Sequence, residues 1–561
     1  MLDKEDPVYK EYLSQLEALE KQRIGYTADF PEAPLDREDP DVRRIIEALA
    51  MFTARTRQAS KSSIERANLR VFQQHFPHVL NPLPAMAMLA ARLDLGHFKD
   101  VADLPRWTEV VFVSRPDPAA LQEEPPREVY FRTLVPMRMV PLSLEHAEIF
   151  RRPQRGYRMV LELAGVHELE DPVGELPLYI NHLNDFGSSL TVRQMLSEHL
   201  EGVAVVYDED VDDSSGGIPC EHYFGEPECP AETAEAYEHA LHHARSLIHF
   251  PQQTMYLNIR VGAGPERYRR CTLILDLDQD WPAALRLNAD TFHLNVTPII
   301  NMRRDLGAPL DYDGTRDRHL IRHPEIGGRF TLHSVLGVYE MGDAGLQPLK
   351  PGVVEWGEGA YEVELEGKDE RRRGFLSLEL PNAFDEPMRV VAEAYWHQPE
   401  LARPEVSRSD LYDAGLTHRY LEGVRWECVG PVTTGMDNPL VARQEGLLRL
   451  LSIKNQRFLS LDDVRFLLDA LAINTTRHFR EVSRSLVHLE VESKPHSSLS
   501  TKSTGFKYVY RLTVNAHDPS ELPVLGLFCA SFFEILQAWS IEEVVELEVL
   551  VPRLEHTMRY P

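Results

Sequence analysis

Cysteine is scarce in this 561-residue chain, and positive charge is in short supply. The cysteines are Cys220, Cys229, Cys271, Cys428 and Cys529. Because they are few and odd in number, they imply no disulfide framework and fit a reducing compartment. Lys and Arg number 60 against 88 Asp and Glu, which gives a formal net charge of −28. Nucleic acids and anionic lipids are bound through clustered Lys and Arg, so neither is an expected partner.

Long apolar runs are missing as well. The most apolar stretch, Val524 to Phe533, is followed by Glu534 and is shorter than the about 20 residues that a membrane-spanning helix needs. The chain starts Met-Leu-Asp-Lys-Glu-Asp, which is acidic where a signal peptide would be basic and then apolar. We therefore expect a cytoplasmic protein that reaches a membrane only through partners, without inserting into it.

What the sequence does contain is typical of a large globular protein, with 43% hydrophobic and 26% charged residues. Its length predicts several domains. Helical and strand patterns do not alternate regularly, which argues against a doubly wound nucleotide-binding fold and favours a multi-domain α+β fold. We expect an N-terminal helical segment over 1–95, a β-rich domain with inserted helices over 96–335, a second β-rich region over 336–438 and an α+β domain over 439–561.

The first ninety or so residues read as helices. A first helix carries apolar residues at helical spacing, including Tyr12, Leu16 and Leu19. A break rich in Pro and Asp covers residues 30–39. Asp39-Pro40 then predicts a helix start, with Asp39 as N-cap and Pro at the first helical position. A third helix is expected from Ser63 to Phe76.

The apolar face of each N-terminal helix must pack against something. The pattern alone fits two arrangements equally well: a local core of three helices, or a bundle completed by other chains. In the second arrangement the side chains of Tyr12, Leu16 and Leu19 are the candidate partner contacts.

Strand patterns dominate the middle of the chain. Short runs rich in β-branched or aromatic residues predict strands at 109–113, 128–132, 159–163, 202–207, 272–277, 337–341, 361–366 and 375–380. Helices are expected at about 191–201 and 231–248, a surface loop at 208–217, and an exposed hairpin tip at 368–373. The last part predicts helices at 447–451, 461–471 and 522–539, the last one buried, and strands at 485–492, 506–514 and 544–551.

A histidine cluster is the strongest candidate for metal chemistry. His239 and His243 lie four residues apart on one predicted helix face, with His242 beside them, which is how two imidazoles bind one zinc ion. The helix lacks the His-Glu-x-x-His order that places a general base beside the metal. A structural zinc site would use Cys220, His222, Cys229 and His239, but the cysteine spacing is wider than in common zinc modules. A solvated or hydrogen-bonded helix is the simpler interpretation.

Two further motifs favour ordinary structural explanations. Gly262-Ala-Gly264 resembles the start of a phosphate loop, but Pro265 removes a backbone N–H that such a loop uses, so a turn is favoured. Asp276, Asp278 and Asp280 alternate near a strand end, where a solvent-facing edge is favoured over a cation site. No nucleophile, base and orienting group come together. We expect no catalytic residue, cofactor or metal; the alternative is a metal-dependent hydrolase using His239, His242 and His243.

Three segments, in this order along the chain, resemble one family: 39–55 with 76–86, 294–301 with Leu310-Asp311, and 473–551. Together they are similar to the TssF (VasA/ImpG) family of the type VI secretion system baseplate. The stretches Ala392 to His397 and Ser452 to Leu461 depart from the usual family pattern, so the chain resembles a divergent member.

The resemblance implies a structural role. TssF proteins form wedges with TssG, two TssF copies to one TssG, and the wedges surround the VgrG hub. TssK joins the wedges to the membrane complex, and TssE links them to the contractile sheath. By this resemblance the partners are TssG, a second TssF copy, TssK, TssE and VgrG. The protein would be cytoplasmic and docked at the inner membrane through other components, and its N-terminal helices would join an intermolecular bundle.

Overall fold

A computed structural model shows the chain as two compact units, Met1–Phe76 with Ala442–Ser452, and Pro77–Val441 with Ile453–Pro561. The described residues are 7–32, 35–36, 39–76, 79–114, 127–152, 156–211, 216–229, 240–262, 264–283, 285–325, 329–342, 345–352, 357–366, 373–380, 383, 386–402, 411–438, 440, 444–454, 456–473, 477–497, 504–540 and 544–560.

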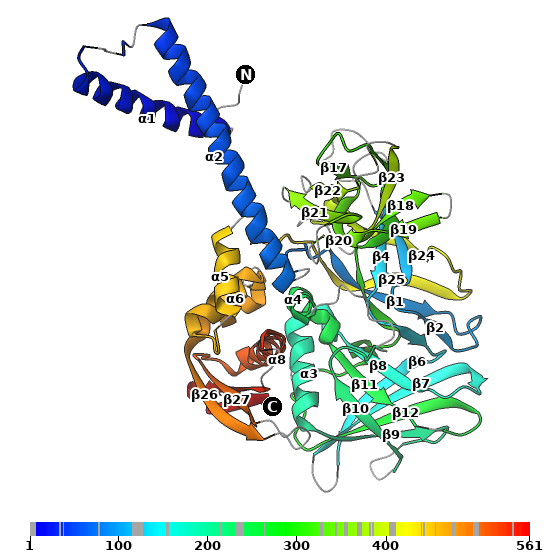
Figure 1. Ribbon diagram of the computed structural model, residues 1–561. Helices are drawn as coiled ribbons and strands as arrows, with labels where there is room; N and C mark the ends of the chain where they lie inside the picture. The colour runs from blue at the N-terminus through cyan, green and yellow to red at the C-terminus, as the bar shows by residue number, and fades with distance from the viewer. Residues whose placement is uncertain are drawn as a thin grey trace, which may run out of the picture. The chain divides into compact units, whose positions relative to one another are not determined.

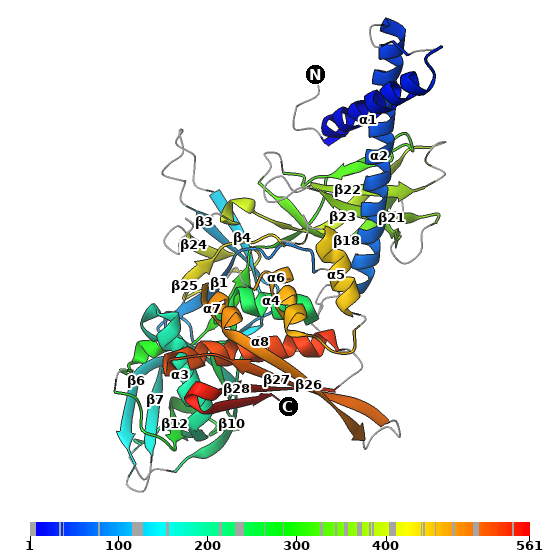
Figure 2. The same ribbon diagram turned by 90° about the vertical axis from the view of Figure 1, so that its left-hand side faces the viewer.

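The first unit is helical. It holds α1 (Pro7–Asp29), α2 (Pro40–His75) and most of α5 (Gln444–Lys454). Figure 1 shows α1 folded back across α2, and Figure 2 shows the same pair from the side. The predicted cap is confirmed, because the Asp39 side chain accepts a hydrogen bond from the Asp41 backbone N–H at 2.9 Å and Pro40 occupies the first turn.

The separate third helix was a wrong prediction, because α2 runs without interruption to His75. The reason is local: no glycine or proline lies between Asp41 and His75, and Ser62-Ser63 lowers helix propensity only slightly. A helix of 36 residues therefore replaces the two that were expected.

The second unit contains a closed six-stranded barrel. In order around the barrel, its strands are β1 (Met86–Leu93), β14 (Val296–Ile300), β4 (Arg127–Thr133), β3 (Glu109–Ser114), β24 (Leu411–Leu416) and β25 (Val424–Thr433). A small ribbon accompanies it, formed by β2 (Ala102–Leu104) and β5 (Met137–Met139). The helical prediction for the first ninety residues is wrong at β1. The first six residues of β1, Met-Ala-Met-Leu-Ala-Ala, are all buried, so the sequence lacks the alternation of apolar and polar residues that marks a half-buried strand. The same residues are also common in helices.

An eight-stranded sheet forms the second β assembly, and its strands in spatial order are β13 (Phe292–His293), β8 (Glu175–Ile180), β11 (Tyr256–Arg260), β10 (Ile218–Phe224), β9 (Leu200–Tyr207), β12 (Tyr268–Leu277), β7 (Tyr157–Leu169) and β6 (Ser143–Arg151). Two helices interrupt it, α3 (Phe186–His199) and α4 (Ala240–His249). The strands predicted at 159–163, 202–207 and 272–277 are confirmed. Helix α3 starts earlier than expected because Asp185 caps it, accepting from the Ser188 N–H.

Two more sheets are formed by strands that lie between Arg303 and His397. Their strands are β15 (Arg303–Leu306), β23 (Met388–His397), β18 (Thr331–Gly342), β19 (Gly345–Pro348) and β16 (Leu310–Tyr312) in one, and β17 (His319–Ile321), β22 (Arg373–Glu379), β21 (Ala360–Glu366) and β20 (Lys350–Pro351) in the other. One apolar cluster spans both sheets and includes Leu332, Leu376 and Trp396. The predicted hairpin tip at 368–373 lies almost entirely outside the described residues.

The C-terminal part is α+β, as predicted. The helices α6 (Leu461–Ala470), α7 (Arg477–Ser485) and α8 (Leu522–Trp539) accompany a sheet of β26 (Leu486–Ser497), β27 (Thr504–Val514), β28 (Val544–Val551) and β29 (His556–Tyr560). Among the described residues one stretch, Pro519–Trp539, is long and apolar enough to span a membrane by length and composition, and 56% of it is buried. It contains α8, which packs against α4, α7 and β28 as a core helix. The multi-domain α+β fold class is confirmed; the four-part division of the chain stays a prediction.

Candidate partner-binding surfaces

Helices α1 and α2 form a pair that we call the N-terminal hairpin, and a few polar contacts hold it together. Arg57 on α2 forms an ion pair with Glu11 on α1 at 3.2 Å. Where the chain leaves α1, Arg23 pairs with Glu20 at 2.9 Å and donates a hydrogen bond to the Leu35 carbonyl at 2.7 Å. The turn between the helices is therefore tied to α1 itself.

The predicted contact residues Tyr12, Leu16 and Leu19 are half-buried in the described structure. On α2, Ala50 and Ala54 are completely buried, and small residues of this kind let helices approach closely. The stripe on α1 is thus partly covered within a single chain. Whether partners contact these three residues stays a prediction.

A large apolar face is exposed along α2. Its large side chains keep 46–69% of their surface exposed: Ile45, Leu49, Phe52, Ile64 and Val71. At about 100° per residue they fall within an arc of about 120° on one side of the helix. Contiguous exposed apolar patches mark interaction sites in soluble proteins. Helical spacing in the sequence already places Ile45 and Leu49 on one apolar stripe, and Phe52, Ile64 and Val71 extend it along the helix.

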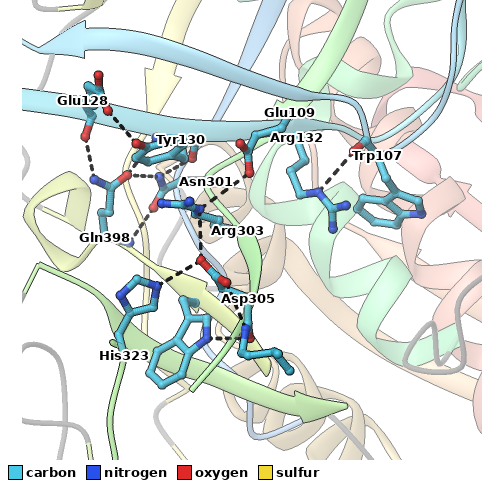
Figure 3. Close-up of polar contacts among 12 residues, drawn as sticks. Trp107, Glu109, Glu128, Tyr130, Arg132, Asn301, Arg303, Asp305, His323 and Gln398 are labelled. Atoms are coloured by element: carbon cyan, nitrogen blue, oxygen red, sulfur yellow. Dashed lines mark hydrogen bonds and ion pairs between the residues drawn. The ribbon is translucent and has the colours of Figure 1, made fainter. Parts of the chain in front are cut away.

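In contrast to the exposed apolar face of α2, a cluster of buried polar groups joins the barrel to the sheet that contains β23 (Figure 3). The Asn301 side chain donates a hydrogen bond to the Tyr130 carbonyl at 2.7 Å and accepts one from the Gln398 N–H at 2.8 Å. The Gln398 side chain accepts from the Tyr130 N–H at 2.9 Å and donates to the Glu128 carbonyl at 2.9 Å. Two amide side chains thus satisfy three backbone groups of β4 and the N–H that directly follows β23. We call this cluster the polar junction.

Charged groups extend the polar junction. The Arg303 guanidinium lies 4.4 Å from the centre of the Tyr130 ring and pairs with Glu109 at 3.9 Å and Asp305 at 3.4 Å (Figure 3). His323 lies 3.5 Å from the same Asp305 carboxylate. Burial lowers the pKa of His323 below its ordinary value despite this neighbour, and Arg303 adds to the effect. The Arg303 ion pairs link β15 to β3 through Glu109, so the arrangement fixes these strands relative to each other.

The structure does not bring the described members of the histidine cluster together. His239 lies outside the described residues. The ring of His242 lies 6.4 Å from that of His333, whereas His243 pairs with Glu226 at 3.3 Å. Within the described ranges no group of three or more His, Cys, Asp or Glu side chains is arranged to hold a metal ion.

Two of the three aspartates in the candidate cation site, Asp276 and Asp278, are paired with basic side chains instead. Asp276 accepts two hydrogen bonds from Arg158, at 2.8 and 3.0 Å. Asp278 lies 3.0 Å from the His199 ring. The partly solvated strand edge favoured from the sequence is therefore the better description.

Comparisons with known proteins identify the family. A family model described as "Type VI secretion system, TssF" matches residues 31–353, which is more than half of the chain. This chain belongs to the TssF family. The match includes α2 with its exposed face, the barrel strands up to β14 and the eight-stranded sheet. The third resembling segment, 473–551, lies outside the matched residues.

Two solved structures resemble this TssF protein in fold. A chain in the structure of the type VI secretion system TssK-TssF-TssG baseplate subcomplex has a TM-score of 0.74 at 16% identity, covering 93% of this chain and 98% of that one. A chain in the baseplate complex from the type VI secretion system has a TM-score of 0.59 at 16% identity, covering 99% and 98%. No curated protein matches the sequence.

Proposed function

We propose that this TssF protein is a structural subunit of a type VI secretion baseplate that forms wedges with TssG, two copies to one TssG, around a VgrG hub. The proposed further partners are TssK and TssE, and the proposed location is the cytoplasmic side of the inner membrane, reached through those components. Membership of the TssF family and the likeness to chains from baseplate assemblies support the proposal. It assigns no catalytic step to the chain.

The exposed face of α2 is the observation that carries the proposal. Phe52 is 69% exposed and Ile64 is 62% exposed, on a helix that needs burial of an apolar face for its stability. We assign this face to an intermolecular helical bundle with TssG and the second TssF copy. Tyr12, Leu16 and Leu19, which are half-buried, are proposed as further contacts on α1.

Co-expression with a candidate TssG protein tests the assignment. Purified complexes are weighed by native mass spectrometry, and a mass equal to two copies of this chain plus one TssG is expected. Phe52→Asp should abolish the complex because an unpaired aspartate cannot be buried in a bundle without a cost of several kcal/mol. The melting temperature of the isolated variant should match wild type, because Phe52 is exposed there.

Gln22→Asp is the matched control, since it places the same charge at an exposed polar position of the same hairpin. It should leave the complex intact. A Phe52→Asp protein that still forms the full complex would show that this face of α2 is not the interface. A wild-type chain that never associates with TssG would refute the proposed wedge altogether.

A further inference from the structure

Helix α2 carries an excess of positive charge in an acidic protein. It holds seven Lys and Arg residues against three Asp and Glu, whereas the whole chain has a formal net charge of −28. Helix α1, which packs against it, has three Lys and Arg against four Asp and Glu. The exposed apolar face of α2 therefore belongs to a helix whose charge is opposite in sign to that of the chain as a whole.

Two cations of α2 have no acidic partner within the chain. Arg57 forms its ion pair with Glu11 of α1 at 3.2 Å. By contrast, Arg55 and Lys61 are exposed, and neither forms an ion pair with any residue that the structure describes. An acidic group of another molecule can therefore approach both of them without first displacing a partner.

Arg55 and Lys61 border the exposed apolar face on opposite sides. Seen down the helix axis, Phe52 and Ile64 mark the two edges of the apolar arc. At about 100° per residue, Arg55 lies about 60° beyond Phe52 and Lys61 about 60° beyond Ile64. The only acidic residue of α2 in this stretch, Glu65, lies about 160° from the middle of the arc and on the far side of the helix. The face is thus apolar in its arc and positive at both edges.

The middle of the face is formed by short side chains. Between Phe52 and Ile64 the arc includes Thr56, Ser60 and Ser63, and all three are exposed. Short side chains let a second helix approach closely, with the larger side chains packing at either end of the contact. Helices that lie on membranes present large apolar side chains along the whole of their buried face. This arrangement therefore favours a partner helix over a lipid surface.

We propose that an acidic amphipathic helix of the partner protein covers the α2 face. Its apolar side chains pack between Phe52 and Ile64, and its Asp or Glu side chains lie at the edges, opposite Arg55 and Lys61. A second α2 helix does not fit as the direct neighbour, because it would bring its own excess of cations to the same edges. The inference rests on the wedge function proposed above and adds the chemistry of the partner helix.

Binding of the full-length chain to a candidate TssG protein, followed in real time at several salt concentrations, tests the proposal. Arg55→Glu combined with Lys61→Glu should slow association about 10- to 100-fold at about 0.05 M salt, because charges at the rim of an interface act mainly on the association rate. At about 0.5 M salt the slowing should shrink to about 3-fold or less, because the charges are screened.

Two controls separate local charge from net charge and from folding. Lys61→Glu alone should slow association about 3- to 10-fold. Lys99→Glu makes the same change at an exposed lysine of the second unit and should leave the rate as in wild type. The melting temperature of the Arg55→Glu, Lys61→Glu variant should match wild type, because neither side chain forms an ion pair with a described residue.

Zero-length coupling with a carbodiimide identifies the acidic side chain of the partner. The reagent joins the Lys61 Nζ atom to a carboxylate in contact with it, and mass spectrometry of the digested complex locates the joined residue. An Asp or Glu of the TssG protein is expected. Lys61→Arg keeps the positive charge, so it should bind as wild type does and lose this crosslink.

The results that would overturn the proposal are distinct from failure of the wedge. If Phe52→Asp abolishes the TssG complex while the double charge variant associates at the wild-type rate at every salt concentration, the chemistry assigned to the partner helix is wrong and the proposed function stands. Vesicles of phosphatidylglycerol and phosphatidylethanolamine that bind the full-length chain but not Phe52→Asp would assign the face to a membrane instead. A chain that never binds TssG overturns both the wedge and this inference.

Discussion

The N-terminal hairpin exposes apolar side chains, whereas the polar junction buries polar ones. In the hairpin, Phe52 and Ile64 turn large apolar side chains outward. In the junction, Asn301 is 1% exposed and Gln398 2% exposed, and both amides are used in hydrogen bonds within the chain. The junction is complete in one molecule, whereas the hairpin leaves apolar surface to be covered. The difference separates the part of the chain built for its own stability from the part built for assembly.

The largest effect is expected at the polar junction. Asn301→Leu leaves the Tyr130 carbonyl and the Gln398 N–H buried without partners, which should destabilise the second unit by about 3 kcal/mol or more. Thermal unfolding measures this as a clear drop in melting temperature. Gln194→Leu, at an exposed amide that bonds Glu198, should change stability by at most about 0.5 kcal/mol. Equal effects of the two would mean that the junction contributes no more than a surface contact.

The next largest effect is expected from pH, which should change the stability of the second unit through His249. Burial, and then the charge of Arg245, lower the pKa of His249 to about 4. The folded second unit therefore keeps His249 neutral while the unfolded chain takes up a proton below about pH 6.5. Stability from this site is complete above pH 6.5 and is lost as the pH falls toward 4, by about 3 kcal/mol in all.

His249→Gln should remove this loss, because glutamine takes up no proton. The same change at the exposed His488 should leave the pH profile as in wild type. A His249→Gln profile that still falls between pH 6.5 and 4 would place the titrating group elsewhere.

The smallest effects are expected within the N-terminal hairpin. They compare the half-buried stripe of α1 with the exposed apolar face of α2. Leu16→Ala removes a half-buried side chain and should destabilise the α1–α2 pair by about 1 kcal/mol. Ile64→Ala removes a side chain that is 62% exposed and should cost about 0.5 kcal/mol or less. Native-state hydrogen exchange of the helix amides measures both. If Ile64→Ala cost as much as Leu16→Ala, the α2 face would already be covered in the isolated chain.

Local signals in the sequence were sufficient for many elements. The Asp39-Pro40 cap predicted the start of α2, and the apolar run before Trp539 predicted α8 as a buried helix. Both depend on residues close together in the chain. By contrast, β1 was missed because it pairs with β14 and β25, and partners more than 200 residues away leave no mark on its own pattern.

The candidate sites were less predictable for the same reason. The Tyr12, Leu16 and Leu19 stripe could be read from helical spacing. The polar junction could not, because Asn301 and Gln398 lie 97 residues apart and meet only in the folded chain. On the exposed α2 face, Ile45 and Leu49 could also be read from helical spacing, but their exposure could not, because it depends on what packs against the helix.

The barrel also has a consequence for biosynthesis. Strand β1 is hydrogen bonded on one side to β25, so the barrel cannot close until the ribosome has passed Thr433. At about 5–20 residues per second, that interval lasts tens of seconds after β1 is made. The α1–α2 hairpin precedes β1 and needs nothing later in the chain for its mutual contacts. The nascent protein therefore displays the apolar face of α2 long before its own barrel is finished, and capture of that face during translation would protect it from aggregation.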